Sequence, residues 1–141
     1  MKTILICTST CRFRVVAFII FMSIGLCAQY SPEHLAQAQL DAYNARDIEA
    51  FLVPYSDSVR VYTFPDKLLY QGKNRMRDNY IYMFSTYPDL NCKLVNRIVQ
   101  GDTVIDQELV TRSKTIPKLE AIAIYKIRNE KIQEVYFIIE N

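Results

Sequence analysis

The sequence has no tryptophan, only three glycines and one histidine, and four cysteines in 141 residues. Three of those cysteines (Cys7, Cys11 and Cys27) lie within the first 28 residues, so Cys92 is alone in the rest of the chain. A single cysteine forms no intramolecular disulfide. Because no histidine follows His34, the sequence also predicts neither a zinc site nor a thiol nucleophile with a neighbouring base, and we expect no cofactor.

The first 28 residues lack acidic side chains. Three basic residues precede a mostly apolar run over residues 15–26, and small residues follow around Ala28. This order is typical of a secretory signal peptide. Two alternatives are less favoured: the run is shorter than the roughly 20 residues of a membrane-spanning helix, and Leu26 is bulky where a lipoprotein signal has a small residue. We expect residues 1–28 to be a signal peptide, residues 29–141 to form one domain, and the protein to be secreted or periplasmic.

A strong charge of one sign is absent as well. The whole chain has 17 basic and 15 acidic residues, and removing the first 28 residues leaves 14 basic against 15 acidic ones. A near-neutral domain gives no reason to expect a nucleic-acid partner or an anionic membrane surface. We therefore expect no nucleic acid as a partner and no stable membrane insertion after signal cleavage.

Three helices are predicted in the first half of the domain. Ser31 and Pro32 are a hydroxyl cap and a first-turn proline, which begin a helix that continues to residue 45. Asp47 can cap a second helix, which Pro54 should kink or end. A third helix is predicted from Lys73 to just before Pro88. Apolar residues at helical spacing define the last two helices: Ile48, Phe51, Leu52 and Tyr55, then Met76, Tyr80, Met83, Phe84 and Tyr87.

Strands make up the rest of the domain. The last four strands form two predicted hairpins, with turn signals at Gly101-Asp102 in the first and at Asn129-Glu130 in the second. The predicted strands cover residues 58–64, 67–72, 92–100, 103–112, 119–128 and 131–140. This order predicts an α+β domain in which a curved, mostly antiparallel sheet carries three N-terminal helices on one face.

The strand "VIDQELV" (104–110) places two carboxylates, Asp106 and Glu108, on one face. If the hairpin turns at Gly101-Asp102, Arg97 lies opposite Asp106 and Val95 lies opposite Glu108. Two interpretations remain open. In the first, the three charged residues form an exposed cross-strand ion pair with a solvated glutamate. In the second, they face a pocket, where Arg97 keeps one carboxylate ionised and the other has a raised pKa suited to acid-base chemistry.

The segments "AYNARDIEAFLVPYSDSVRVYTFP", "LLYQGKNRMRDNY" and "EAIAIYKIRNEKIQEVYFI" resemble the SnoaL-like branch of the nuclear transport factor 2 superfamily. The resemblance implies a cone-shaped domain around a deep, mostly apolar cavity. Members of this family include ketosteroid isomerases, polyketide cyclases and limonene-epoxide hydrolases, and also domains that only bind or associate. Many dimerise through the outer face of the sheet, which implies a homodimer through the face that carries Glu120, Ile122 and Ile124.

The resemblance also allows the ketosteroid isomerase positions to be compared. It places Thr63 at the catalytic base and Gln39 and Ala123 at the two oxyanion donors, so all three positions depart from the isomerase pattern. Tyr55 and Tyr80 match supporting tyrosines. Without a base and an oxyanion hole at these positions, ketosteroid isomerisation itself is not expected.

The expected function is binding of a small, largely apolar organic molecule in the cavity. One hypothesis is a cofactor-free isomerase, cyclase or hydrolase with Asp106, Glu108 and Arg97 as catalytic residues. The alternative is a non-catalytic ligand-binding or dimeric interaction module. Alternation along the predicted strands and the apolar faces of the predicted helices place these residues around the ligand: Tyr43, Tyr55, Thr63, Tyr80, Ala123, Tyr125 and Phe137.

Overall fold

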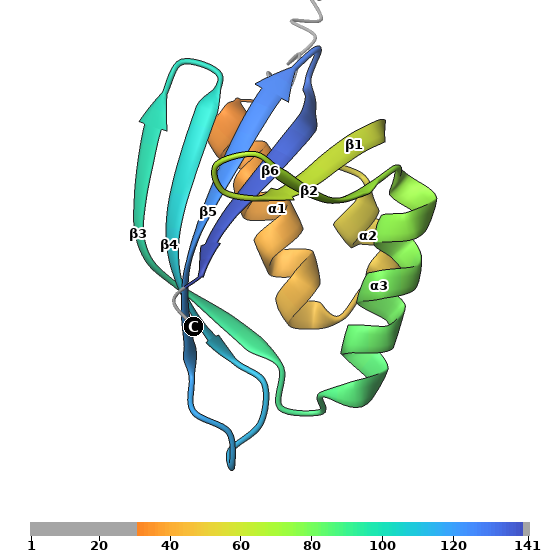
Figure 1. Ribbon diagram of the computed structural model, residues 1–141, viewed down its shortest axis with the longest axis vertical. Coiled ribbons are helices and arrows are strands. Elements are labelled where there is room, and N and C mark those ends of the chain that lie inside the picture. Colours follow the sequence, from red (N-terminus) through yellow and green to blue (C-terminus); the bar gives the residue numbers. More distant parts are fainter. Residues whose placement is uncertain (1–30, 140–141) are drawn as a thin grey trace, which may run out of the picture.

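The computed structural model describes residues 31–139 of the chain (Figure 1). The predicted signal peptide, residues 1–28, lies outside the described residues. Within residues 31–139, none of the helices has the length and apolar composition needed to cross a membrane.

Three helices and six strands form a mixed α+β fold. The helices are α1 (Pro32–Ala45), α2 (Ile48–Leu52) and α3 (Lys73–Thr86); the strands are β1 (Tyr55–Thr63), β2 (Lys67–Gln71), β3 (Asn91–Gln100), β4 (Thr103–Thr111), β5 (Leu119–Arg128) and β6 (Lys131–Ile139). The sheet order is β2-β1-β6-β5-β4-β3, and β1 pairs with β6 in parallel while the other pairs are antiparallel. Figure 1 shows the three helices gathered on one side of the twisted sheet. The predicted fold class is confirmed.

The helix starts follow from local capping. The Ser31 hydroxyl accepts a hydrogen bond from the His34 N–H, and the Asp47 carboxylate accepts one from the Ala50 N–H. Tyr55 was predicted on the apolar stripe of the second helix, and this was wrong, because Pro54 ends α2 at Leu52 and Tyr55 begins β1. The carbonyl of Pro54 instead accepts from Ile132 N–H of β6 at 2.9 Å.

Tight turns set the register of the last four strands. Asn129 and Glu130 both have positive φ, at 51° and 56°, as a two-residue hairpin turn requires. The predicted pair of Arg97 with Asp106 is confirmed, but the predicted pair of Val95 with Glu108 is wrong. The register shifts between Leu94 and Asn96, so Leu94 lies opposite Glu108.

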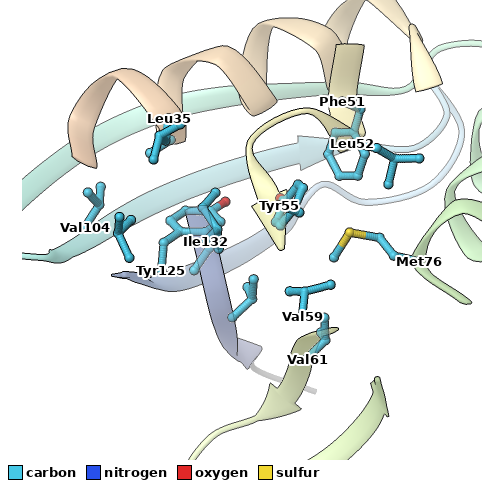
Figure 2. Packing of buried hydrophobic residues seen from close by; sticks show 14 of the residues in the cluster. Leu35, Phe51, Leu52, Tyr55, Val59, Val61, Met76, Val104, Tyr125 and Ile132 are labelled. Carbon is cyan, nitrogen blue, oxygen red and sulfur yellow. The ribbon is translucent and has the colours of Figure 1, made fainter. Parts of the chain in front are cut away.

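The apolar core lies between the helices and the sheet (Figure 2). It joins Leu35 from the first turn of α1 to Val104 from the start of β4 and Phe51 from α2. The Phe51 ring lies 4.2 Å from that of Tyr80 and 5.2 Å from that of Tyr55, measured between centroids. The C-terminal halves of α1 and α3 also enclose a second space, whose lining shares Val61 and Tyr125 with the core.

Candidate functional site

A cavity of about 470 Å³ lies between the C-terminal halves of α1 and α3 and the facing strands. Most of its wall is aliphatic or aromatic. The exceptions with amide or charged side chains are Gln39, Asn79, Glu108 and Arg112. Ala121 lies directly between Glu108 and Ile139 across the sheet, and its short side chain leaves room beside the glutamate. The cavity suits a compact apolar molecule that meets a few polar groups.

The predicted ligand residues divide into two groups. Tyr43, Tyr80, Tyr125 and Phe137 line the cavity, whereas Tyr55, Thr63 and Ala123 are not part of its lining. Tyr55 and Ala123 belong to the core, with exposed fractions of 2% and 0%. Thr63 is the last residue of β1 and is only half-buried. The inward face of the sheet thus serves both the core and the cavity, and Val61 and Tyr125 belong to both.

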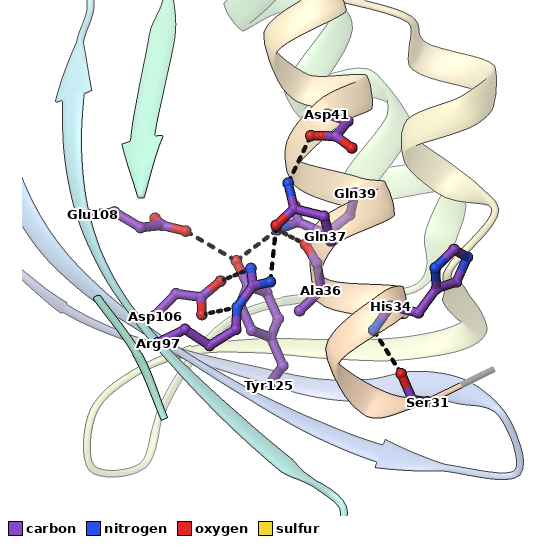
Figure 3. A network of polar contacts seen from close by, with 10 residues as sticks. All are labelled: Ser31, His34, Ala36, Gln37, Gln39, Asp41, Arg97, Asp106, Glu108 and Tyr125. Atoms are coloured by element: carbon purple, nitrogen blue, oxygen red, sulfur yellow. Dashed lines mark hydrogen bonds and ion pairs between the residues drawn. The ribbon is translucent and has the colours of Figure 1, made fainter. Parts of the chain in front are cut away.

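Arg97 and Asp106 form a buried ion pair that ties the sheet to α1 (Figure 3). The Nε and Nη2 atoms of Arg97 donate to the two Asp106 carboxylate oxygens, both at 2.7 Å, and Nη1 donates to Gln37 Oε1 at 2.9 Å. The Asp106 hydrogen bond is the main reason that the pKa of Arg97 is raised. Neither residue lines the cavity. Their geometry positions β3, β4 and α1 and keeps a fully buried carboxylate paired.

Glu108 is the carboxylate that does line the cavity, and a directed chain of hydrogen bonds ends on it. Tyr55 Oη donates to Gln39 Oε1 at 3.1 Å, and Gln39 Nε2 donates to Tyr125 Oη at 2.9 Å. Tyr125 Oη then donates to Glu108 Oε1 at 3.3 Å, as Figure 3 shows. Each member is buried, so the chain fixes the carboxylate in the cavity wall.

Burial raises the pKa of Glu108 to about 7, and the negative charge of Asp106 adds to this effect. Hydrogen bonds from Tyr125 and Cys92 and the charge of Arg97 lower it, but by less. A carboxyl group with this pKa is present in both ionised and neutral forms near neutral pH. Such a group can both accept and donate a proton, as a general acid-base catalyst must.

The thiol and phenol groups near Glu108 stay neutral. Burial raises the pKa of the Cys92 thiol well above its usual range, and the same cause raises the pKa values of Tyr43, Tyr80 and Tyr125. Cys92 is therefore a thiol and a poor nucleophile. Among residues 31–139, no cluster of three or more His, Cys, Asp or Glu side chains could hold a metal ion.

Gln39 and Arg112 are among the cavity residues that the sequence analysis did not identify as binding groups. Gln39 was considered only as a departure from the isomerase pattern, although it is a polar residue on the buried stripe of α1 that includes Leu35 and Ala36. Arg112 follows β4 with the same parity as Asp106 and Glu108, so extending the period-two pattern past the strand end would have indicated it.

Replacing Arg97 by alanine should lower the free energy of unfolding by about 3 kcal/mol, because Asp106 would be left buried without its cation. Urea denaturation followed by circular dichroism measures this change. The double variant Arg97→Met with Asp106→Leu removes both charges and should recover most of the loss. A single variant as stable as the parent would show that the pair does not hold the fold.

Replacing Glu108 by glutamine should change the pH dependence of stability. The folded-state pKa of about 7 lies above the ordinary value of 4.5, so folding favours the protonated form. The stabilising contribution is complete below about pH 4.5 and is lost as the pH rises through about 7, a difference of about 3 kcal/mol. In the Glu108→Gln variant this fall should be absent.

The measurement is urea denaturation at several pH values between 4.5 and 8. Since His34 is the only histidine of the chain, a His34→Gln replacement in both proteins removes histidine titration from the comparison. An equally steep fall in the glutamine variant would assign the titration to another group.

The profile of the SnoaL-like domain family matches residues 36–135. No curated protein sequence matched the chain. Among solved structures, a cystatin-fold protein from Novosphingobium aromaticivorans has 24% identity and a TM-score of 0.72, covering 77% of this chain and 97% of its own.

Two further solved structures have similar folds. A proposed ketosteroid isomerase from Kribbella flavida is 15% identical, with a TM-score of 0.66 and 78% of each chain covered. A proposed SnoaL-like polyketide cyclase from Jannaschia sp. is 13% identical, with a TM-score of 0.64, covering 77% of this chain and 85% of its own. At these identities the likeness concerns the fold alone. The match over residues 36–135 establishes that the chain belongs to the SnoaL-like domain family.

Proposed function

We propose that the protein binds a small, largely apolar organic molecule in its cavity and catalyses a proton transfer within it, using Glu108 as the acid-base group. The observation that carries this proposal is a carboxyl group with a pKa near 7 in the wall of an apolar cavity of about 470 Å³. A general base is most effective when its pKa lies near the working pH.

The reaction class follows from the single titrating carboxyl group in the described cavity lining. In an isomerisation or an aldol-type cyclisation, a carboxylate can take a proton from carbon and return it to another atom of the same molecule. The names of the structurally similar proteins, an isomerase and a polyketide cyclase, are compatible with this class. Hydrolysis is less favoured, because Asp106 is held by Arg97 outside the cavity lining and does not supply a second catalytic carboxylate.

Glu108 differs in place from the base that the ketosteroid isomerase comparison indicated. Thr63 and Ala123, which the resemblance placed at two catalytic positions, do not line the cavity. The proposed chemistry therefore comes from β4, and ketosteroid isomerisation remains unexpected. The Tyr125 hydroxyl donates to Glu108 and lines the same cavity.

The proposal predicts enzyme-catalysed hydrogen exchange on an apolar ketone. The parent protein should accelerate deuterium incorporation at the α-carbons of 2-tetralone in D₂O, followed by NMR. The rate should rise with pH to a plateau above about 7 as Glu108 ionises, and Glu108→Gln should lower it by at least about 100-fold. Gln107→Glu, on the opposite face of the same strand, is the control for an added carboxylate outside the cavity. Equal rates in the parent and Glu108→Gln would contradict the catalytic role.

A second feature supports association of two copies through the outer face of the sheet. On the face away from the helices, the register aligns a continuous apolar row: Ile98, Ile105, Ile124, Tyr136 and Tyr62. The rings of Tyr62 and Tyr136 are stacked with centroids 4.7 Å apart, and Ile98 is 55% exposed. A contiguous apolar surface of this kind is typical of a protein interface, so we propose a homodimer.

In analytical ultracentrifugation the parent should sediment as a dimer, and Ile124→Lys should shift it to a monomer because a charge would be buried in the interface. Ile81→Lys is the control, since Ile81 is exposed on α3 rather than on the sheet. A monomeric parent at tens of micromolar would rule out a stable dimer through this face.

A further inference from the structure

Arg112 is the cationic side chain of the described cavity lining, and its Nε donor is not used by the protein. It follows directly after β4 and lines the cavity together with Glu108 and Val110. Its Nε atom is buried and has no hydrogen-bond partner within residues 31–139. A buried donor left without a partner is costly, and native proteins rarely keep one without a reason.

Arg97 provides the comparison within the same molecule. Arg97 lies on β3, opposite β4, and Arg112 directly follows β4. The Nε and Nη2 atoms of Arg97 donate to Asp106, and its Nη1 donates to Gln37. The structure thus satisfies the guanidinium that lies outside the cavity lining and leaves the Nε of the one in the lining unsatisfied. A ligand that carries a planar anion would accept hydrogen bonds from the guanidinium of Arg112, as the carboxylate of Asp106 does from Arg97.

Resting on the proposed function, we infer that the ligand of this cavity is an organic acid, an apolar body with one carboxylate that pairs with Arg112. Glu108 and Arg112 are four residues apart, on the order of 13 Å along an extended chain. The carboxylate would therefore anchor one end of the molecule, and the apolar body would extend along Val110 and Leu119 toward Glu108 and the reacting carbon.

The arrangement also keeps the two charges of ligand and protein apart. If the ligand carboxylate lay beside Glu108, each negative charge would oppose ionisation of the other. At the Arg112 end, the ligand charge is compensated and Glu108 keeps its ability to accept a proton. Arg112 would thus be a specificity-determining residue that fixes the orientation of the bound ligand.

Binding of two matched probes tests this inference. Naphthalene-2-carboxylate and naphthalene-2-carboxamide have nearly the same shape, and only the first is charged. Titration calorimetry at pH 8 should show the parent binding the carboxylate about 10- to 100-fold more tightly, as expected for a charge-assisted hydrogen bond. Arg112→Gln should remove this preference, because it weakens binding of the carboxylate far more than binding of the carboxamide.

Three further variants complete the experiment. Arg112→Lys keeps the charge without the planar fork and should retain part of the preference, while Arg75→Gln, at an exposed arginine of α3, should leave it intact. Ala121→Phe fills the space beside Glu108 and should weaken both probes equally. Equal affinities in the parent, or an unchanged preference in Arg112→Gln, would overturn the inference alone. Binding of neither probe would contradict the proposed cavity function as well.

Discussion

The ion pair between Arg97 and Asp106 is the interaction on which the geometry of the site depends. It connects two adjacent strands to the first helix inside the protein, through two hydrogen bonds of 2.7 Å and a third to Gln37. A buried ion pair contributes little net stability, because both charges lose their hydration. Its value here is specificity: only one register of β3 against β4 brings the guanidinium opposite the carboxylate.

The same pair separates the roles of two carboxylates that are only two residues apart. Asp106 is matched by a full positive charge outside the cavity lining. Glu108 has neutral partners, so burial dominates and its pKa rises. The negative charge of Asp106 reinforces that rise, which means that the structural carboxylate tunes the functional one. One face of one strand thus contains a carboxylate paired with an arginine and a carboxyl group that titrates near neutral pH.

The sequence was sufficient for the element order, the fold class and the pairing of Arg97 with Asp106, because caps, turn residues and period-two alternation are local signals. It could not show that Tyr55 and Ala123 lie in the core alone while Tyr125 and Phe137 also line the cavity. All of these residues were predicted on the inner side, and the difference lies in how far the core extends along the sheet. That extent depends on packing among helices and strands distant in sequence, such as Phe51 against Tyr80. The parallel pairing of β1 with β6 was invisible for the same reason.

The register shift between Leu94 and Asn96 places on the same face two residues that simple alternation would place on opposite faces. Cys92 and Arg97 are five positions apart, an odd number, yet Cys92 lines the cavity and Arg97 pairs with the inward-facing Asp106. The extra residue in the strand is what allows both to point inward. Deleting Val95 would leave Cys92 and Arg97 four positions apart, so ordinary alternation would keep both on the inner face. The strand thus accommodates one additional residue without changing which of its side chains face the cavity.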